Sequence, residues 1–574
     1  MIAPAALLAR LQARSREALA ALPQWLLRLP LLLARMLFGV VRSAFGRGRP
    51  EPHAVARARI LLCMLVFAGV YIAIAGRLAM FASAPDGALA RRGLGTDAVA
   101  SARPDILDRN GLVLATDVKS ASLFGEPNRI IDVDEAVEAL TAVLPDLDGN
   151  ELRQRLSTKR GFIWLKRDIT PQQQREIHNL GLPGIGFMTE NRRVYPGGTL
   201  GAHVMGSTNI DNQGIAGIEK WVDTGGLADL HLAGFASDRQ QEPIELALDL
   251  RVQHVLRDEL STAKEKFKAI AAAGTVVDVR TGEIVAMVSL PDFDANDPAK
   301  SLDPKNLNRL TTGVFEMGST FKALTFAMAL DSGRFNINST LDARGALQFG
   351  RFRIHDYHAE NRVLTLPEVF LYSSNIGTAK MALALGVDAH KAFLSKAGQL
   401  DRLRTELPES AAPIVPKRWG ELNTATIAFG HGLAVAPLQA VMAVNALVNG
   451  GYLIPPTFLK RTPEEAQALA KPIIKPETSA KMRYLLRLNA EKTKLLTTFT
   501  GIFPMDNPQY LVLVILDEPQ AVEGTYGYAT AGWNAAPTTG KIISRIGPML
   551  GIMPRTDLPS PESLLANTTL ARAP

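Results

Sequence analysis

The chain has 574 residues and one cysteine, Cys63, and this scarcity limits the kinds of site it can hold. A single cysteine excludes a disulfide framework within the chain and a zinc site built from cysteines. The sequence also shows no internal repeat and no low-complexity tract. Hydrophobic residues make up 47% of the chain and charged residues 21%. At this length we expect two or more globular domains, with an apolar surplus that one membrane helix would explain.

Acidic residues are scarce in the first sixty positions, although the whole chain carries a formal net charge of only +7. Ten arginines stand there against Glu17 and Glu51, and beyond this segment the charges nearly balance. We therefore expect no basic face for nucleic acid on the folded part of the chain. The arginines are Arg10, Arg14, Arg16, Arg28, Arg35, Arg42, Arg47, Arg49, Arg57 and Arg59.

Residues 60–76 carry no charge, and after Arg77 the apolar character continues to residue 82. About 20 apolar residues cross a bilayer core, so 60–82 is predicted to be a single transmembrane helix with Arg77 reaching the far interface. The arginine-rich side stays in the cytoplasm, which makes 1–59 a basic cytoplasmic tail and exports the rest. A buried core helix is one alternative, and a cleaved signal peptide is another that the long preceding segment disfavours.

Two β-hairpins are predicted at opposite ends of the second half of the chain, each around a short turn. Long helical patterns fill the interval between them, beginning with 250–267. This order predicts an α+β domain in which an antiparallel sheet is flanked by helices. The paired strands are 274–279 with 284–288, and 495–503 with 510–516.

Ser319 and Lys322 lie three positions apart in a segment, 316–330, that is predicted to be helical. Residues at this spacing share one helix face, so the lysine would lie beside the serine. A serine hydroxyl becomes a good nucleophile only when a base takes its proton, and a desolvated lysine can be neutral enough to do so. An S-x-x-K match also occurs by chance, and an N-cap serine with a solvated lysine is the alternative. We expect Lys322 near a cleft mouth, where it would contribute little packing.

Residues 373–375 (Ser-Ser-Asn) add a second motif, S-x-N, some fifty positions later. With it, the sequence resembles the class B penicillin-binding proteins, close to the division-specific D,D-transpeptidases, whose nucleophile motif is similar to 312–322. The resemblance covers about 57–552. Further matches are 103–111, 193–196, 202–203 and 214–219, which resemble that family's pedestal domain, and 249–253, 430–432 and 437–439, which resemble its transpeptidase domain.

This resemblance implies an α+β protein with one N-terminal transmembrane helix, a mixed pedestal domain at 83–237 and a penicillin-binding transpeptidase domain at 238–574. It also implies the roles of the site residues, with no cofactor and no metal. Ser319 would attack the carbonyl of the penultimate D-Ala of a peptidoglycan stem peptide, and Lys322 would be the base. Ser373 would relay a proton to the leaving amine, and Asn375 would bind the substrate amide and touch Lys322.

The implied partners are stem peptides ending in D-Ala-D-Ala, β-lactams, the membrane, a membrane glycosyltransferase and other division proteins, with no nucleic acid. The implied location is the cell inner membrane, crossed once, with the catalytic domain in the periplasm. A β-lactamase is disfavoured by the anchor and the pedestal.

Three histidines are also candidates for a metal site or for catalysis. His355 and His358 flank Asp356 at a spacing like that of metal ligands, but no third ligand is apparent and the family uses no metal. We expect them to be loop histidines, and we expect His203 to be a structural residue of the pedestal.

No K-T-G triplet occurs in the sequence, although the resemblance predicts one just before strand 495–503. Lys492 and Thr493 supply two letters of it, and 538–541 has the wrong order. In the family this edge strand binds the substrate carboxylate and supplies one oxyanion donor, and losing a donor costs about 100- to 1000-fold in rate. We expect 495–503 to become the sheet edge and acylation to be slow; a catalytically impaired membrane scaffold of the division machinery is the alternative.

Overall fold

The computed structural model describes residues 60, 63–64, 66–72, 74–75, 103–226, 242–492 and 498–555. The described residues up to 75 are helical and exposed. Within all these ranges, no helix is both long and apolar enough to span a membrane. The predicted tail and part of the predicted membrane segment lie outside the described residues. The chain from Val99 to Pro574 forms a compact unit of its own.

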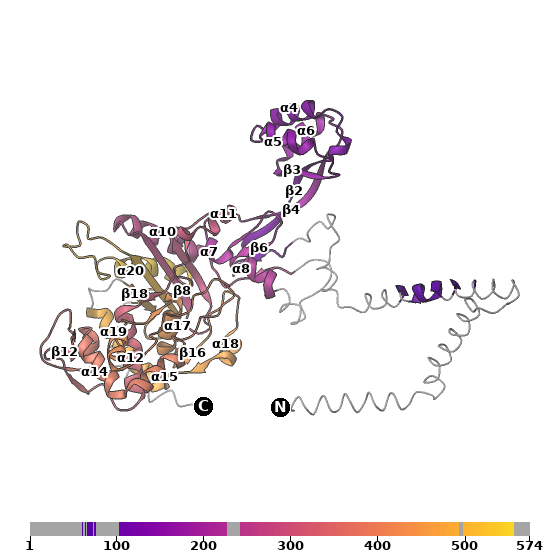
Figure 1. Cartoon of the computed structure of the whole chain (residues 1–574). Helices are drawn as coiled ribbons and strands as arrows, with labels where there is room; N and C mark the ends of the chain where they lie inside the picture. The colour runs from indigo at the N-terminus through magenta and orange to yellow at the C-terminus, as the bar shows by residue number, and fades with distance from the viewer. Residues whose placement is uncertain are drawn as a thin grey trace, which may run out of the picture. The chain divides into compact units, whose positions relative to one another are not determined.

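A long antiparallel ribbon forms the first part of that unit. Strand β2 (Val113–Gly125) pairs with β4 (Ile185–Val194) and, toward its end, with β3 (Ile163–Ile169). Three helices gather around a small apolar core at this end of the ribbon (Figure 1): α4 (Val133–Val143), α5 (Gly149–Leu156) and α6 (Pro171–Asn179). Helix α6 starts with a reciprocal cap between Thr170 and Gln173, because the threonine side chain and the glutamine side chain each bond the other's backbone.

Short elements form the other end of the ribbon. Strand β1 (Ile106–Leu107) pairs antiparallel with β2 and parallel with β7 (Ile244–Glu245), which leads into the catalytic domain. The pedestal sheet therefore includes residues from both of the predicted domains. The remaining elements here are α7 (Ala202–Met205), β5 (Ser207–Thr208), β6 (Gly214–Ala216) and α8 (Gly217–Trp221).

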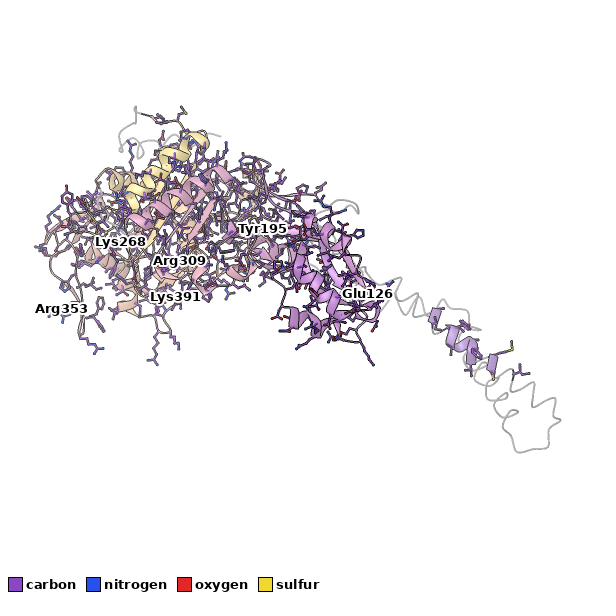
Figure 2. The ribbon with its side chains drawn as sticks, turned by 90° about the horizontal axis from the view of Figure 1, so that it is seen from above. Glu126, Tyr195, Lys268, Arg309, Arg353 and Lys391 are labelled. Carbon is purple, nitrogen blue, oxygen red and sulfur yellow. The ribbon has the colours of Figure 1, made fainter. Side chains whose placement is uncertain are left out.

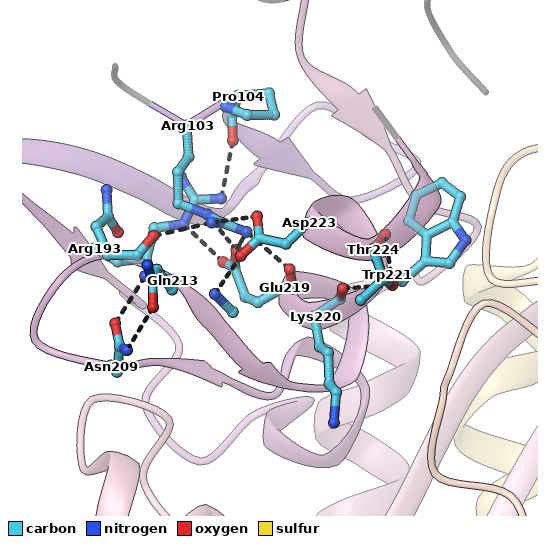
Figure 3. Close-up of polar contacts among 12 residues, drawn as sticks. Arg103, Pro104, Arg193, Asn209, Gln213, Glu219, Lys220, Trp221, Asp223 and Thr224 are labelled. Atoms are coloured by element: carbon cyan, nitrogen blue, oxygen red, sulfur yellow. Dashed lines mark hydrogen bonds and ion pairs between the residues drawn. The ribbon is translucent and has the colours of Figure 1, made fainter. Parts of the chain in front are cut away.

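A buried ion cluster holds this end of the pedestal together (Figure 3). Arg193 on β4 bonds Glu219 on α8 at 2.7 Å and Asp117 on β2 at 3.1 Å. Arg103 bonds the same Glu219 at 2.9 Å and Asp223 at 2.6 Å. The side chains of Arg193 and Glu219 are 1% and 0% exposed, so each charge is compensated almost entirely by protein groups.

The catalytic domain is built on an antiparallel sheet in the order β18-β19-β8-β9. Its strands are β8 (Ala271–Asp278), β9 (Ile284–Leu290), β18 (Thr498–Phe503) and β19 (Tyr510–Asp517). Strands β8 and β9 are buried along their whole length, because helices cover both faces. Helices α10 (Leu250–Lys266) and α20 (Ala535–Met549) pack on one face, while α12, α17 and α19 contribute to the core on the other.

The helical part of the domain lies between the two hairpins in sequence, as predicted. Figure 2 shows Arg353 at the periphery of this part and Glu126 in the pedestal. Its helices are α12 (Lys322–Asp331), α13 (Leu366–Leu371), α14 (Asn375–Leu385), α15 (Val387–Lys396), α16 (Glu421–Ile427), α17 (Pro437–Val448), α18 (Pro463–Leu469) and α19 (Pro476–Lys492). Its short strands are β10 (Phe315–Glu316), β11 (Thr340–Asp342), β12 (Leu347–Phe349), β13 (Phe352–Ile354), β14 (Val363–Thr365), β15 (Ala434–Val435), β16 (Tyr452–Leu453) and β17 (Lys471–Pro472).

Both predicted hairpins are confirmed in the part of the chain that the structure describes. Val276 faces Ala286 across the first hairpin, and Gly501 faces Val512 across the second. The second hairpin is described from Thr498 onward, and residues 495–497 lie outside the described part.

The helix predicted at 316–330 begins later in the structure. Helix α12 starts at Lys322, and the residues before it form a strand and a 3₁₀ turn.

Candidate active site

Ser319 lies in a 3₁₀ turn, Gly318–Phe321, that runs directly into α12. The turn starts at Gly318, whose φ of +53° is a left-handed conformation that suits glycine. Just before it, β10 pairs with β15, with Phe315 opposite Val435. The nucleophile candidate is therefore fixed on one side by a short strand ladder and on the other by a buried helix.

A second glycine lets another loop approach the backbone beside Ser319. The amide of Gly318 donates to the carbonyl of Gly430 at 3.3 Å. A Cβ atom on Gly430 would lie 2.0 Å from the carbonyl oxygen of Gly318, which is far inside van der Waals contact. Only glycine fits at 430, and this requirement explains the glycine at the start of the G-H-G segment.

Lys322 is buried, with 3% of the residue exposed, and its burial lowers the pKa to about 7 despite the opposing negative charge of Asp356. The expectation that it lies near a cleft mouth with little packing is wrong. Helix α12 packs against α13, α14, α15, α17 and α19, and its residues from Lys322 to Leu330 are all buried. Burial leaves a substantial fraction of the amine neutral near pH 7, which is the state a base requires.

A chain of hydrogen bonds connects three of the four candidate residues. The amine Nζ of Lys322 donates to the Oγ of Ser373 at 2.7 Å and also to the Ser373 carbonyl oxygen. The Oγ of Ser373 in turn donates to the Oγ of Ser319 at 3.2 Å. The structure thus brings Ser319, Ser373 and Lys322 together, with Ser373 between the other two.

The second motif forms a strained turn into a helix. Ser373 has a φ of +53°, which costs a residue with a side chain about 1 to 3 kcal/mol. Ser374 is the N-cap of α14, and its Oγ accepts from the amide of Gly377 at 3.0 Å. Asn375 is the first residue of α14, and its side-chain amide donates to the carbonyl of His355 at 3.0 Å. The resemblance implied that Asn375 touches Lys322, whereas this hydrogen bond goes to His355.

Asp356 takes part in this site, although in the sequence it stands out only as the neighbour of two possible metal ligands. Its carboxylate accepts from the Ser374 hydroxyl at 2.6 Å and from the Ile376 amide at 2.9 Å. The only signal in the sequence was a charged residue between two histidines in a loop, and nothing local connects it with the second motif. Among the described residues, no group of three histidine, cysteine, aspartate or glutamate side chains could hold a metal ion.

Glu316 and His431 form an outer contact between the two loops at Ser319. The carboxylate of Glu316 accepts from the Nδ1 of His431 at 2.8 Å and from the amide of Gly432 at 2.8 Å. Burial acts to raise the pKa of Glu316, but these two hydrogen bonds outweigh it and lower the pKa. His203 lies elsewhere, half-buried beside Phe293, and its Nε2 bonds the Asn306 carbonyl at 2.7 Å.

A polar cavity of about 250 Å³ lies between the pedestal and residues 295–298, and is lined by Arg167, Glu190, Tyr195 and Asn296 among others, but by no candidate site residue. Its arginines pair with carboxylates of the same region, as Arg167 does with Glu190 at 2.6 Å. The cavity is therefore not part of the candidate active site.

The opposite wall of the site is described only in part. Strand β18 pairs with β19 on one side, and within the described ranges no strand pairs with its other side. Residues 493–497, where the predicted K-T-G segment would be sought, lie outside the described part of the chain. The expectation of slow acylation therefore stays a prediction.

Comparison with known families agrees with this two-part architecture. Residues 98–222 match the penicillin-binding protein dimerisation domain, and residues 272–497 match the penicillin binding protein transpeptidase domain. The chain belongs to the penicillin-binding proteins, as a class B member that joins these two domains.

Several of its relatives carry the name peptidoglycan D,D-transpeptidase. A probable peptidoglycan D,D-transpeptidase FtsI from Caulobacter vibrioides is 35% identical over 563 residues, covering 90% of this chain and 93% of the relative. A probable peptidoglycan D,D-transpeptidase PenA from Neisseria gonorrhoeae is 31% identical, covering 81% and 87%. The solved structure of a peptidoglycan synthetase from Bifidobacterium adolescentis has a TM-score of 0.60 at 22% identity, covering 79% of this chain and 97% of that one, and shows the shared fold.

Proposed function

We propose that this protein is a peptidoglycan D,D-transpeptidase of the division septum that acts through an acyl-enzyme on Ser319. The observation that carries the assignment of the site is the buried Lys322, whose pKa is lowered to about 7 and whose amine reaches Ser319 through Ser373. The transpeptidase-domain match and the names of the relatives support the reaction and the substrate class.

In the first half-reaction, the Oγ of Ser319 attacks the carbonyl carbon of the penultimate D-Ala. The proton of Ser319 passes to Ser373, and that of Ser373 to the neutral amine of Lys322, so both hydrogen bonds reverse their direction. The bond to the terminal D-Ala breaks, and its amine takes a proton from the hydroxyl of Ser373, which regains one from Lys322. An ester on Ser319 remains, and D-Ala leaves.

In the second half-reaction, an amine of a neighbouring stem peptide attacks the ester carbonyl. Its proton enters the Ser373–Lys322 path, the ester bond breaks, and the hydroxyl of Ser319 is restored. A β-lactam enters the first half-reaction by opening its ring on Ser319, and the product blocks the site. Lys322 suits both halves, because a group with a pKa near the working pH can accept and return a proton.

Covalent labelling tests this assignment. We expect a fluorescent penicillin to label the full-length protein, mass spectrometry to place the adduct on Ser319, and Ser319→Ala to abolish it. Ser332→Ala is a matched control, because Ser332 follows α12 and its hydroxyl bonds only the Ala329 carbonyl and the Arg334 amide. An adduct on Ser373 or Ser374 would contradict the assigned roles.

We also propose that residues 60–82 anchor the protein in the inner membrane, with 1–59 in the cytoplasm, a pedestal at 83–237 and a periplasmic transpeptidase domain at 238–574. The charge asymmetry around 60–82 supports this topology. A reporter that works only outside the cytoplasm should be active when fused after residue 100 and silent when fused at residue 50. The reverse pattern would contradict the topology.

The proposed partners follow from this location: D-Ala-D-Ala stem peptides, a membrane glycosyltransferase and other division proteins. The absence of a K-T-G triplet was the reason to consider a scaffold without catalysis. The names of the relatives and the transpeptidase-domain match favour the enzyme over that alternative.

A further inference from the structure

The hairpin formed by β12 and β13 has one face packed against the catalytic domain and one face in solvent. Ile354 on β13 is buried in an apolar cluster with Ala379 of α14 and Phe429, which follows α16, and Figure 1 shows β12 beside α14. Side chains alternate between the two faces of a strand, so Arg353 lies on the opposite, exposed face, with Gln348 as its cross-strand neighbour. The hairpin therefore presents a polar, basic face to solvent.

The end of this hairpin lies at the second motif. The carbonyl of His355, the first residue after β13, accepts from the side chain of Asn375 at 3.0 Å. Extended residues advance about 3.3 Å each, so the backbone of Arg353 lies roughly 7 Å from that of His355. A peptide that binds at Asn375 and continues for several residues can therefore meet the hairpin.

Two arginines of the hairpin, Arg351 and Arg353, differ from the other arginines between β11 and β14. Arg344 pairs with Asp342 at 2.9 Å, and Arg362 also pairs with carboxylates. Within the part of the chain that the structure describes, Arg351 and Arg353 form no ion pair, and both are exposed. Their guanidinium groups are thus available to a partner from outside the chain.

Exposed aromatic side chains accompany these two arginines. Phe352 is 51% exposed and Tyr357 is 77% exposed. Arg351 lies over the ring of Phe352 at 5.1 Å, and the ring of Tyr357 contacts that of His358 at 4.7 Å. Arginine and aromatic side chains are enriched where proteins bind partners, and large apolar side chains that gather on a surface often mark such a place. We call Arg351, Phe352, Arg353 and Tyr357 the basic rim.

The substrate of the proposed function is an anion, and the described part of the site offers it little positive charge. A stem peptide has a carboxylate at its D-Ala terminus and a further carboxylate on its D-glutamate. The cation of the site is the buried Lys322, whose amine bonds Ser373, and Asp356 places a negative charge beside the second motif. Positive charge at the rim would offset this repulsion, and a guanidinium group binds a carboxylate through two parallel hydrogen bonds.

We propose that the basic rim binds the carboxylate of an acidic residue that precedes the D-Ala pair in the stem peptide. The inference rests on the proposed function, since it names the part of the same substrate that the rim selects. It gives the rim selectivity for an acidic peptide and assigns it no step of the chemistry. Arg351 and Arg353 supply the charge, and Phe352 and Tyr357 supply apolar surface beside it.

Binding of two matched peptides to the full-length protein tests the proposal. Both are fluorescent stem pentapeptides, one with the free α-carboxylate of its D-glutamate and one with a carboxamide in its place. The measurements use a Ser319→Ala background, which prevents acylation. We expect the double substitution Arg351→Gln and Arg353→Gln to weaken binding of the acid peptide by roughly three- to tenfold, as for two partly exposed charged pairs, and to spare the amide peptide. Arg344→Gln is the matched control, because this exposed arginine of the same segment already pairs with Asp342.

Salt and a conservative variant give two further readouts. Added salt should reduce the preference of the parent protein for the acid peptide, because exposed charges are screened. Arg351→Lys with Arg353→Lys keeps both charges and should retain most of the preference. Thermal unfolding of each variant shows whether the hairpin substitutions leave the fold intact.

The outcomes separate this proposal from its alternatives. Unchanged binding of the acid peptide in the double glutamine variant would overturn it, as would an equal loss for both peptides, because the hairpin would then act through its shape. Loss of binding only to vesicles that contain phosphatidylglycerol would also overturn it, since the rim would then bind the membrane. If the wild type forms no penicillin adduct on Ser319, the proposed function fails, while the two peptides still decide whether the rim binds a carboxylate.

Discussion

Arg193 in the pedestal and Lys322 in the catalytic domain are both buried cations, but their surroundings differ in one respect. Burial alone would lower the pKa of both, yet Glu219 and Asp117 raise that of Arg193, while Lys322 ends at about 7. Arg193 bonds two carboxylates directly, whereas the bonds of Lys322 go to the neutral oxygens of Ser373. Direct bonds to carboxylates therefore oppose the effect of burial on the pKa of Arg193, whereas the bonds of Lys322 to neutral oxygens leave the effect of its burial dominant.

The largest effect on stability is expected from removing a carboxylate from the buried ion cluster around Arg193. Glu219→Gln should lower the free energy of unfolding by about 3 to 5 kcal/mol, because Arg103 and Arg193 would stay buried without their shared carboxylate. Urea unfolding of the full-length protein measures this change.

Glu151→Gln is the control for this substitution, because Glu151 forms an exposed pair with Arg155 at 3.5 Å. We expect it to change the free energy of unfolding by less than about 0.5 kcal/mol. Equal effects of the two substitutions would show that burial does not distinguish the pairs.

At the other site, Lys322→Met should separate catalysis from stability. Acylation should fall by about a hundredfold or more, the usual contribution of a general base. The free energy of unfolding should rise below pH 7, because the methionine fills the same space without a buried charge. Penicillin labelling and urea unfolding measure the two effects.

The stability advantage of Lys322→Met should depend on pH in a defined direction. The folded pKa is about 7 and the unfolded reference is 10.5, so the unfolded chain binds the proton more tightly between these values. The wild type therefore gains stability as the pH rises through this window, and the advantage of the variant should disappear toward its upper end. Lys391→Met, which removes an exposed lysine, is the control variant. A constant difference across the window would contradict the lowered pKa.

The smallest effect is expected where a charged pair is exposed. The side chains of Glu316 and His431 are 47% and 61% exposed, so Glu316→Gln should cost less than about 1 kcal/mol. Since the pKa of Glu316 is lowered from 4.5, this contribution should be present above that pH and lost as the pH falls through the folded value. Acid titration of thermal stability in both proteins measures it, and a larger difference at low pH would reverse the predicted sign.

The sequence predicted the features of the site that depend on neighbouring residues and missed those that depend on residues far away along the chain. Ser319, Lys322 and Ser373 were found because each lies in a short motif. The burial of Lys322 was missed because it arises from helices that lie far away in the sequence. Asp356 was missed for a similar reason, since it bonds Ser374 and Ile376 across 18 and 20 positions from an irregular loop.

The elements of the fold were likewise predicted where they depend on local sequence. Both hairpins and helix α10 were predicted from local periodicity and turn residues. The parallel pairing of β1 with β7 was not predicted, because two-residue strands carry no pattern and the pairing joins residues more than a hundred positions apart. The late start of α12 was missed because the residues before it pair with β15 and contact Gly430, which both lie in another segment of the sequence.

The contact between Gly318 and Gly430 has a consequence for how the protein can vary. Neither residue has a side chain for chemistry, yet a methyl group at 430 would collide with the backbone beside Ser319. In a library of all single substitutions selected for cell growth, we expect position 430 to be as intolerant as Ser319. Intolerance at such positions would identify where two loops must touch and would not identify a group that reacts.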